Sequence, residues 1–176
     1  MSALTSWITI NKTKMSKTKI LAIDPGTRAM GVALLEGDKL VYHAVKTIKK
    51  GKTPHETLTE GRKIILRLID DFQPDVLAVE KTFFANNRNA AILNVFADEI
   101  KSIGKRKGLE VYGFAPSTVK KFITGNGRAS KLEVAKVVIA QYPELKVYLN
   151  QDRKWKEEYH LNMFDAVALG IVAGAM

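Results

Sequence analysis

Short apolar runs bounded by Gly, Pro and Asp recur along most of the chain, which is the pattern of buried strands. On this basis we predict strands at residues 19–23, 31–35, 40–48, 76–79 and 109–114. The Glu36-Gly37-Asp38 stretch is a turn signal, and it predicts a hairpin between the second and third strands. The chain therefore opens with three consecutive antiparallel strands.

Apolar residues at helical spacing fill the intervals between and after these runs. They predict helices at residues 58–72, 86–107, 117–123, 130–141 and 162–173. Gly108 is expected to cap the end of the second helix, and Ser117 to cap the start of the third. Ser130 and Glu133 have the spacing of a capping box at the start of the fourth helix. Residues 142–160 follow no sustained period and receive no predicted structure.

The order of these elements predicts an α/β fold. Three antiparallel strands come first and helix-linked parallel strands follow, which gives a mixed sheet with helices on both faces, as in ribonuclease H. Residues 1–19 are polar and basic, and we expect a flexible leader there. Residues 20–176 are expected to form a single domain.

The charge balance points to a polyanionic partner. The chain carries 28 Lys and Arg against 18 Asp and Glu, a formal net charge of +10 spread along its whole length. Such a surface neutralises phosphates and releases their counterions, so nucleic acid is the expected ligand. The chain has no cysteine, which excludes disulfides, thiolate metal sites and thiol nucleophiles. It also lacks a long apolar stretch, so we expect a cytoplasmic protein that does not enter a membrane.

Three carboxylates occupy positions where a purely structural role is hard to justify. Asp24 and Glu80 each follow an apolar strand directly, and Asp165 lies within an apolar helix. An ionised carboxylate in such a helix is costly unless a cation or a donor meets it. If the first and fourth strands are neighbours, all three side chains converge, and clustered carboxylates bind hard cations such as Mg²⁺. Two such ions can promote hydrolysis of a phosphodiester.

Four segments of the sequence resemble, in the same order, the motifs of the RuvC family of Holliday junction resolvases. They are Ile20 to Arg28 with Gly31, Gln73 to Phe83, Thr118 to Lys131, and Asp165 to Leu169. This resemblance implies a structure-selective endonuclease that acts as a homodimer and nicks opposed strands of four-way junctions symmetrically. It also implies dependence on Mg²⁺, with Mn²⁺ as a substitute, and a branch-migration motor as a possible partner in bacterial or viral DNA metabolism.

The resemblance also implies roles for individual residues. The metal ligands would be Asp24, Glu80, Asp165 and Asn162. Lys131 would stabilise the phosphate at the cut, and Phe83 would stack on an unpaired base near the junction centre. The remaining DNA contacts would come from Lys120, Lys121 and Arg128.

Asn162 departs from the family pattern, which has an acidic residue or histidine one helical turn before the last Asp. Its amide oxygen can still bind a hard cation, although without charge. Three explanations remain open: a natural variant with weaker metal binding, a substitution that disables cleavage, or transfer of the ligand role to His160. Asn162 motivates one alternative function, a junction-binding protein with weak or no cleavage. A ribonuclease H-like nuclease acting on RNA–DNA hybrids is a further alternative, independent of Asn162.

Overall fold

The computed structural model describes residues 18–82, 88–149 and 154–176. A five-stranded sheet has the order β3-β2-β1-β4-β5. Its antiparallel part consists of β1 (Lys19–Asp24), β2 (Ala29–Glu36) and β3 (Lys39–Thr47), and its parallel part adds β4 (Val76–Glu80) and β5 (Glu110–Phe114). The predicted mixed sheet of three antiparallel strands followed by parallel strands is confirmed.

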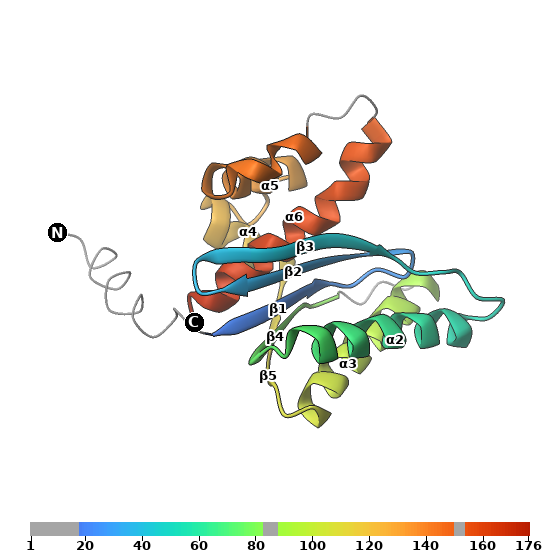
Figure 1. Ribbon diagram of the computed structural model, residues 1–176. Helices are drawn as coiled ribbons and strands as arrows, with labels where there is room; N and C mark the ends of the chain where they lie inside the picture. The colour runs from blue at the N-terminus through green and yellow to red at the C-terminus, as the bar shows by residue number, and fades with distance from the viewer. Residues whose placement is uncertain (1–17, 83–87, 150–153) are drawn as a thin grey trace.

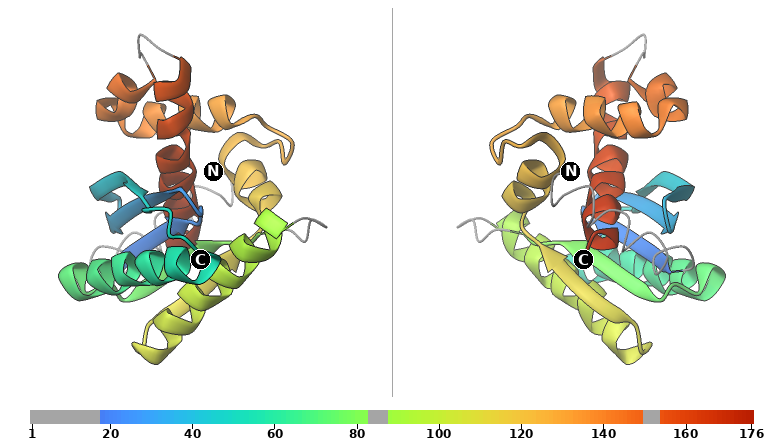
Figure 2. Two further views of the ribbon diagram at one scale, coloured as in Figure 1. Left: turned by 90° about the vertical axis from the view of Figure 1, so that its right-hand side faces the viewer. Right: turned by 90° about the vertical axis from the view of Figure 1, so that its left-hand side faces the viewer.

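Helices cover both faces of the sheet, as the sequence predicted (Figure 1). One face carries α2 (Pro54–Phe72) and α3 (Arg88–Arg106). The other carries α4 (Pro116–Thr124), α5 (Lys131–Gln141) and α6 (Lys154–Gly174), with a 3₁₀ segment at Pro143–Tyr148. The two side views of Figure 2 show the same arrangement, with helices on each face of the sheet.

Strand β1 contributes side chains to two hydrophobic cores, one on each face of the sheet. Ile20 and Ala22 point into the core beneath α6, whereas Leu21 and Ile23 point into the core beneath α2 and α3, because successive strand side chains alternate between faces. All four are buried. A strand that is apolar at every position is therefore the expected signature of a sheet covered on both sides.

Three of the predicted helix boundaries were wrong, and the first of these is the start of α2, which begins at Pro54 rather than at Leu58. Helix α4 has Ala115 as its N-cap and Pro116 in its first turn, so Ser117 lies inside the helix and does not cap it. Helix α6 begins at Lys154 rather than at Asn162. By contrast, Ser130 and Glu133 do form the predicted capping box, and Gly108 does adopt the left-handed conformation with φ of 76°.

Two glycines allow helix α6 to pack closely against the sheet. A Cβ added at Gly31 would lie 1.9 Å from the backbone oxygen of Asn162, and one added at Gly170 would lie 2.3 Å from a methyl carbon of Leu35. At Gly31 the obstacle is backbone, so only glycine leaves room for the helix there, whereas at Gly170 the obstacle is the end of the Leu35 side chain. The close contact at Gly31 fixes where α6 crosses β2.

None of the helices among the described residues combines the length and the apolar composition needed to span a bilayer.

Candidate active site

The ends of β1 and β4 bring two of the three carboxylates together. The strands are parallel neighbours, and Ile23 is paired with Val79, so Asp24 and Glu80 follow at adjacent positions on the same edge of the sheet. Both side chains are partly buried. The neighbouring strands assumed from the sequence are therefore present, and they place Asp24 beside Glu80.

Helix α6 brings the third carboxylate to the same edge. Asp24 is paired with Gly31 across the antiparallel ladder, and the backbone of Asn162 rests directly on Gly31. Asp165 follows one helical turn later and is only 8% exposed. The missing side chain of Gly31 is thus what allows α6 to reach Asp24.

Lys131 provides the positive charge at this cluster. Its Nζ lies 2.5 Å from Oδ2 of Asp165 and donates a hydrogen bond of 3.3 Å to Oδ1 of Asn162. Lys131 is the first residue of α5, where the capping box of Ser130 and Glu133 fixes the helix start. Burial lowers the pKa of Lys131, but Asp165, Asp24 and Glu80 outweigh that effect and raise the pKa above its usual value.

The surroundings of the three carboxylates disfavour their ionised form and raise their pKa values. Burial first, and then repulsion from Glu80 and Asp165, raises the pKa of Asp24 well above its usual range. Burial also raises the pKa of Asp165, although Lys131 and Lys120 act against it. The pKa of Glu80 rises to about 7, through burial and then repulsion from Asp165. A cluster of this kind is poised to accept a further cation.

This electrostatic state predicts how stability depends on pH when metal is absent. Glu80 has a pKa of about 7 in the folded protein and one near 4.3 when unfolded. The folded state therefore holds the proton more tightly, and the free energy of unfolding falls as pH rises from about 4 to about 7. Gln does not titrate, so we expect Glu80→Gln to lack this decrease in the free energy of unfolding, which is on the order of 2–3 kcal/mol.

The measurement is the melting temperature in chelator between pH 5 and 8. Asp71→Asn is the matched control, because Asp71 is an exposed acid of α2 in a surface ion pair with Arg67. An equal pH dependence in Glu80→Gln and the unaltered protein would contradict the assignment.

The donor set fits a hard cation by its chemistry, since it consists of carboxylate oxygens and one amide oxygen. Among the described residues, however, no three acidic or imidazole side chains are arranged to hold a metal ion as they stand. The ammonium of Lys131 occupies one side of Asp165 instead. A metal ion held by Asp24, Glu80 and Asp165 would therefore require these side chains to change position.

Only some of the other predicted site residues lie near the carboxylates. Lys120, on α4, is near enough to lower the pKa of both Glu80 and Asp165, whereas Lys121 and Arg128 are exposed. Phe83 lies outside the described residues. The structure therefore places Lys120 with the carboxylates, and Lys121 and Arg128 on the surface.

His160 does not join the cluster in this arrangement. Its ring lies 4.8 Å from that of Tyr148 and 5.3 Å from that of Tyr159, measured between centroids. Burial lowers its pKa. Asn162, by contrast, faces Lys131. The geometry favours Asn162 over His160 as the fourth oxygen or nitrogen donor.

A five-stranded mixed sheet with carboxylates at the ends of its two central parallel strands, and a third on the covering helix, defines a nuclease of the ribonuclease H fold. The sequence profile described as Crossover junction endodeoxyribonuclease RuvC matches residues 20–171. The chain belongs to the RuvC family.

Individual relatives agree with this assignment. Crossover junction endodeoxyribonuclease RuvC of Alkaliphilus metalliredigens is 31% identical over 161 residues, which cover 86% of this chain and 90% of the relative. The structure of Thermus thermophilus RuvC superimposes with a TM-score of 0.68 at 23% identity, covering 90% of this chain and 94% of the other. A second structure, T. thermophilus RuvC in complex with Holliday junction substrate, gives a TM-score of 0.67 at 23% identity, with coverages of 88% and 91%.

Proposed function

We propose that this chain is a structure-selective endonuclease that resolves Holliday junctions and other branched DNA by metal-dependent hydrolysis of phosphodiesters. The observation that carries the proposal is the meeting of Asp24, Glu80 and Asp165 with Lys131 at one edge of the sheet. The relatives named as crossover junction endodeoxyribonucleases support it, as does the junction complex of T. thermophilus RuvC. Strand β1 begins at Lys19, so the nuclease domain would include residue 19 together with residues 20–176.

Each residue of the cluster has a distinct task in this proposal. The carboxylates of Asp24, Glu80 and Asp165 would hold Mg²⁺, or Mn²⁺ in its place, with Oδ1 of Asn162 as a neutral fourth ligand. Two bound ions would supply the means to activate water and to stabilise the leaving oxygen. Lys131 would move from Asp165 to a phosphate oxygen as the negative substrate enters the cluster, and Lys120 would bind the neighbouring backbone.

The direct test is cleavage of a labelled four-way junction with Mg²⁺ or Mn²⁺ and with chelator. We expect paired nicks on opposed strands, which requires a homodimer, and no product in chelator. Tight junction binding without nicks in either metal would favour the alternative of a binding protein. Faster cleavage of an RNA–DNA hybrid than of the junction would favour the ribonuclease H-like alternative.

Asn162→Asp is expected to increase cleavage in Mg²⁺ by roughly tenfold or more, because a charged ligand replaces a neutral amide at the cluster. The side chain is already directed toward Lys131, whose ammonium would then lie between two carboxylates. The rate should be measured at several Mg²⁺ concentrations, because the gain should be largest where the metal is not saturating. An unchanged rate at every concentration would exclude Asn162 as a weakened ligand.

A homodimer and contact with a branch-migration motor belong to the same proposal. Val95 of α3 is an apolar side chain that is 55% exposed, and this helix would form part of the dimer interface. Measuring the molecular mass in solution tests this part of the proposal independently of cleavage.

A further inference from the structure

A concavity lined by basic, hydroxyl and apolar side chains lies on the same edge of the sheet as the carboxylates. It has a volume of about 210 Å³ and is formed by the loop between β1 and β2, the chain that leaves β3, and the start of α2. The side chains that matter here are those of Thr27, Arg28, Lys50 and Lys52, with Pro54 and Ile92 contributing apolar walls. Because α2 and α3 supply these walls, the pocket lies on the opposite face of the sheet from α5 and Lys131.

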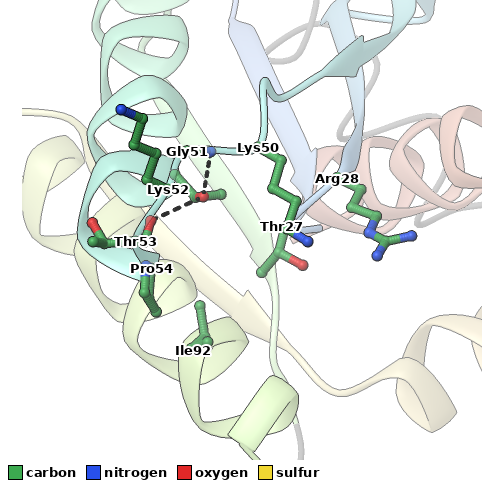
Figure 3. Close-up of a pocket in the computed structure, with 9 residues that line it drawn as sticks. Thr27, Arg28, Lys50, Gly51, Lys52, Thr53, Pro54 and Ile92 are labelled. Atoms are coloured by element: carbon green, nitrogen blue, oxygen red, sulfur yellow. Dashed lines mark hydrogen bonds between the residues drawn. The ribbon is translucent and has the colours of Figure 1, made fainter.

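The pairing of β2 with β3 explains why these basic residues meet. Ala29 is paired with Thr47, and the backbone N–H of Ile48 donates a 2.8 Å hydrogen bond to the carbonyl of Arg28. The chain that leaves β3 therefore runs beside the chain that enters β2, and it carries Lys50 to the β1–β2 loop. Figure 3 shows Lys50 reaching toward Thr27, with Arg28 next to it, while Lys52 points away.

Two of the three basic residues that line this pocket, Arg28 and Lys50, have no acidic partner in the part of the chain that the structure describes. Among the described residues, no carboxylate forms an ion pair with Arg28 or Lys50. The acid at the helix start, Glu56, is already engaged, because its Oε2 accepts a 2.6 Å hydrogen bond from the backbone N–H of Lys52. Like charges that share a pocket repel each other, and an anion between them removes that repulsion.

Local hydrogen bonds engage several backbone N–H groups at the start of α2. Thr53 caps α2 by accepting from the backbone N–H of Glu56, and Thr57 accepts from the backbone N–H of Gly51. These local bonds leave the guanidinium of Arg28 and the ammonium of Lys50, with the hydroxyl of Thr27 beside them. Guanidinium, ammonium and hydroxyl groups are the side-chain donors that most often contact DNA phosphates.

The size of the pocket favours a small anion. Pockets that hold drug-sized molecules have volumes of about 300–1,000 Å³, so 210 Å³ is suited to a smaller group. We propose that this pocket binds one backbone phosphate of the DNA strand that crosses the carboxylate cluster, on the side of the cut opposite to Lys120 and Lys131. This inference rests on the proposed function, because it takes the substrate to be DNA.

The position of the pocket gives it a defined part in binding. Arg28 follows Asp24 by only four residues, at the same edge of the sheet. A strand whose phosphate reaches the carboxylates is then held on both sides, by α4 and α5 on one face and by Arg28 and Lys50 on the other. The pocket would therefore position the strand and does not act on the reacting bond.

The test compares Arg28→Gln, Lys50→Gln and the double variant with Lys39→Gln. Lys39 is an exposed lysine at the far end of the sheet, so its replacement removes the same charge as either single variant, but away from the pocket. Binding of a labelled four-way junction is measured in chelator between about 50 and 200 mM salt, which gives the slope of log K against log salt.

We expect the double variant to bind about tenfold more weakly and to lose about 0.9 from the salt slope, the value for one phosphate contact. Lys39→Gln should change neither by a comparable amount. A double variant that behaves like Lys39→Gln would overturn the inference. Binding measured in chelator does not depend on cleavage. If the double variant has a lowered salt slope but the unaltered protein never cuts DNA, the result would support phosphate binding by the pocket and contradict the proposed cleavage. Absence of DNA binding by the unaltered protein would reject both.

Discussion

Asp24→Asn should reduce junction cleavage by roughly 10³-fold or more, while junction binding persists or becomes tighter. Asp24 is the central carboxylate of the cluster, adjacent to Glu80 across the parallel pair and close enough to Asp165 for the two charges to repel. Removal of one electrostatic group from a preorganised site commonly costs 10²–10³ in rate, and a metal ligand should cost at least as much. The loss of a negative charge near the phosphate need not weaken binding.

Cleavage rates with Mg²⁺ and junction affinity in chelator should be measured on the same preparation. Asp38→Asn serves as the control, since Asp38 is an exposed acid in the β2–β3 turn at the opposite end of the sheet. Loss of both binding and cleavage in Asp24→Asn would instead assign Asp24 a structural role.

Gly31→Ala should reduce cleavage by about 10²-fold although the substitution introduces only a methyl group. The added carbon would lie 1.9 Å from the backbone oxygen of Asn162, so α6 must move away from the sheet. Overpacking of this kind costs about 1–3 kcal/mol, and a misplacement of about 1 Å can lower a rate 10²-fold. The displaced helix carries Asn162 and Asp165, and we therefore expect the rate to fall more than the stability alone would suggest.

Gly113→Ala is the matched control for this prediction. Gly113 is also a strand glycine, but its added carbon would meet only the flexible side chain of Lys81, at 3.1 Å. Melting temperature, junction affinity and cleavage rate should be recorded for both variants. Equal cleavage by Gly31→Ala and Gly113→Ala would show that the close approach of α6 does not control the site.

The sequence was sufficient to predict the sheet and the three carboxylates because both depend on short-range pattern. An apolar run that ends abruptly in an acid identifies Asp24 and Glu80, and the parallel pairing of their strands follows from the order of elements. The approach of α6 to Gly31 was not predicted, because it depends on which backbone atoms meet across two layers.

The start of α6 was missed for a related reason. Its first turns extend past the sheet, so they need no continuous apolar face and carry none of the expected period (Figure 1). Tyr159 instead shares a 3.1 Å hydrogen bond with the hydroxyl of Thr47 on β3. The meeting of Arg28 with Lys50 was likewise hidden, since it depends on the register between β2 and β3.

The capping box at the start of α5 has a further consequence. Lys131 places a positive side chain at the first position of a helix, where the helix dipole favours a negative one. The ammonium of Lys131 is thus unfavourable for the helix start, although it stabilises the carboxylates. The hydrogen bonds between Ser130 and Glu133 stabilise the helix start against that charge. A redesign that optimised the stability of α5 alone would replace Lys131 with an acid, and it would then add a fourth carboxylate beside Asp165 in place of that cluster's nearest counterion.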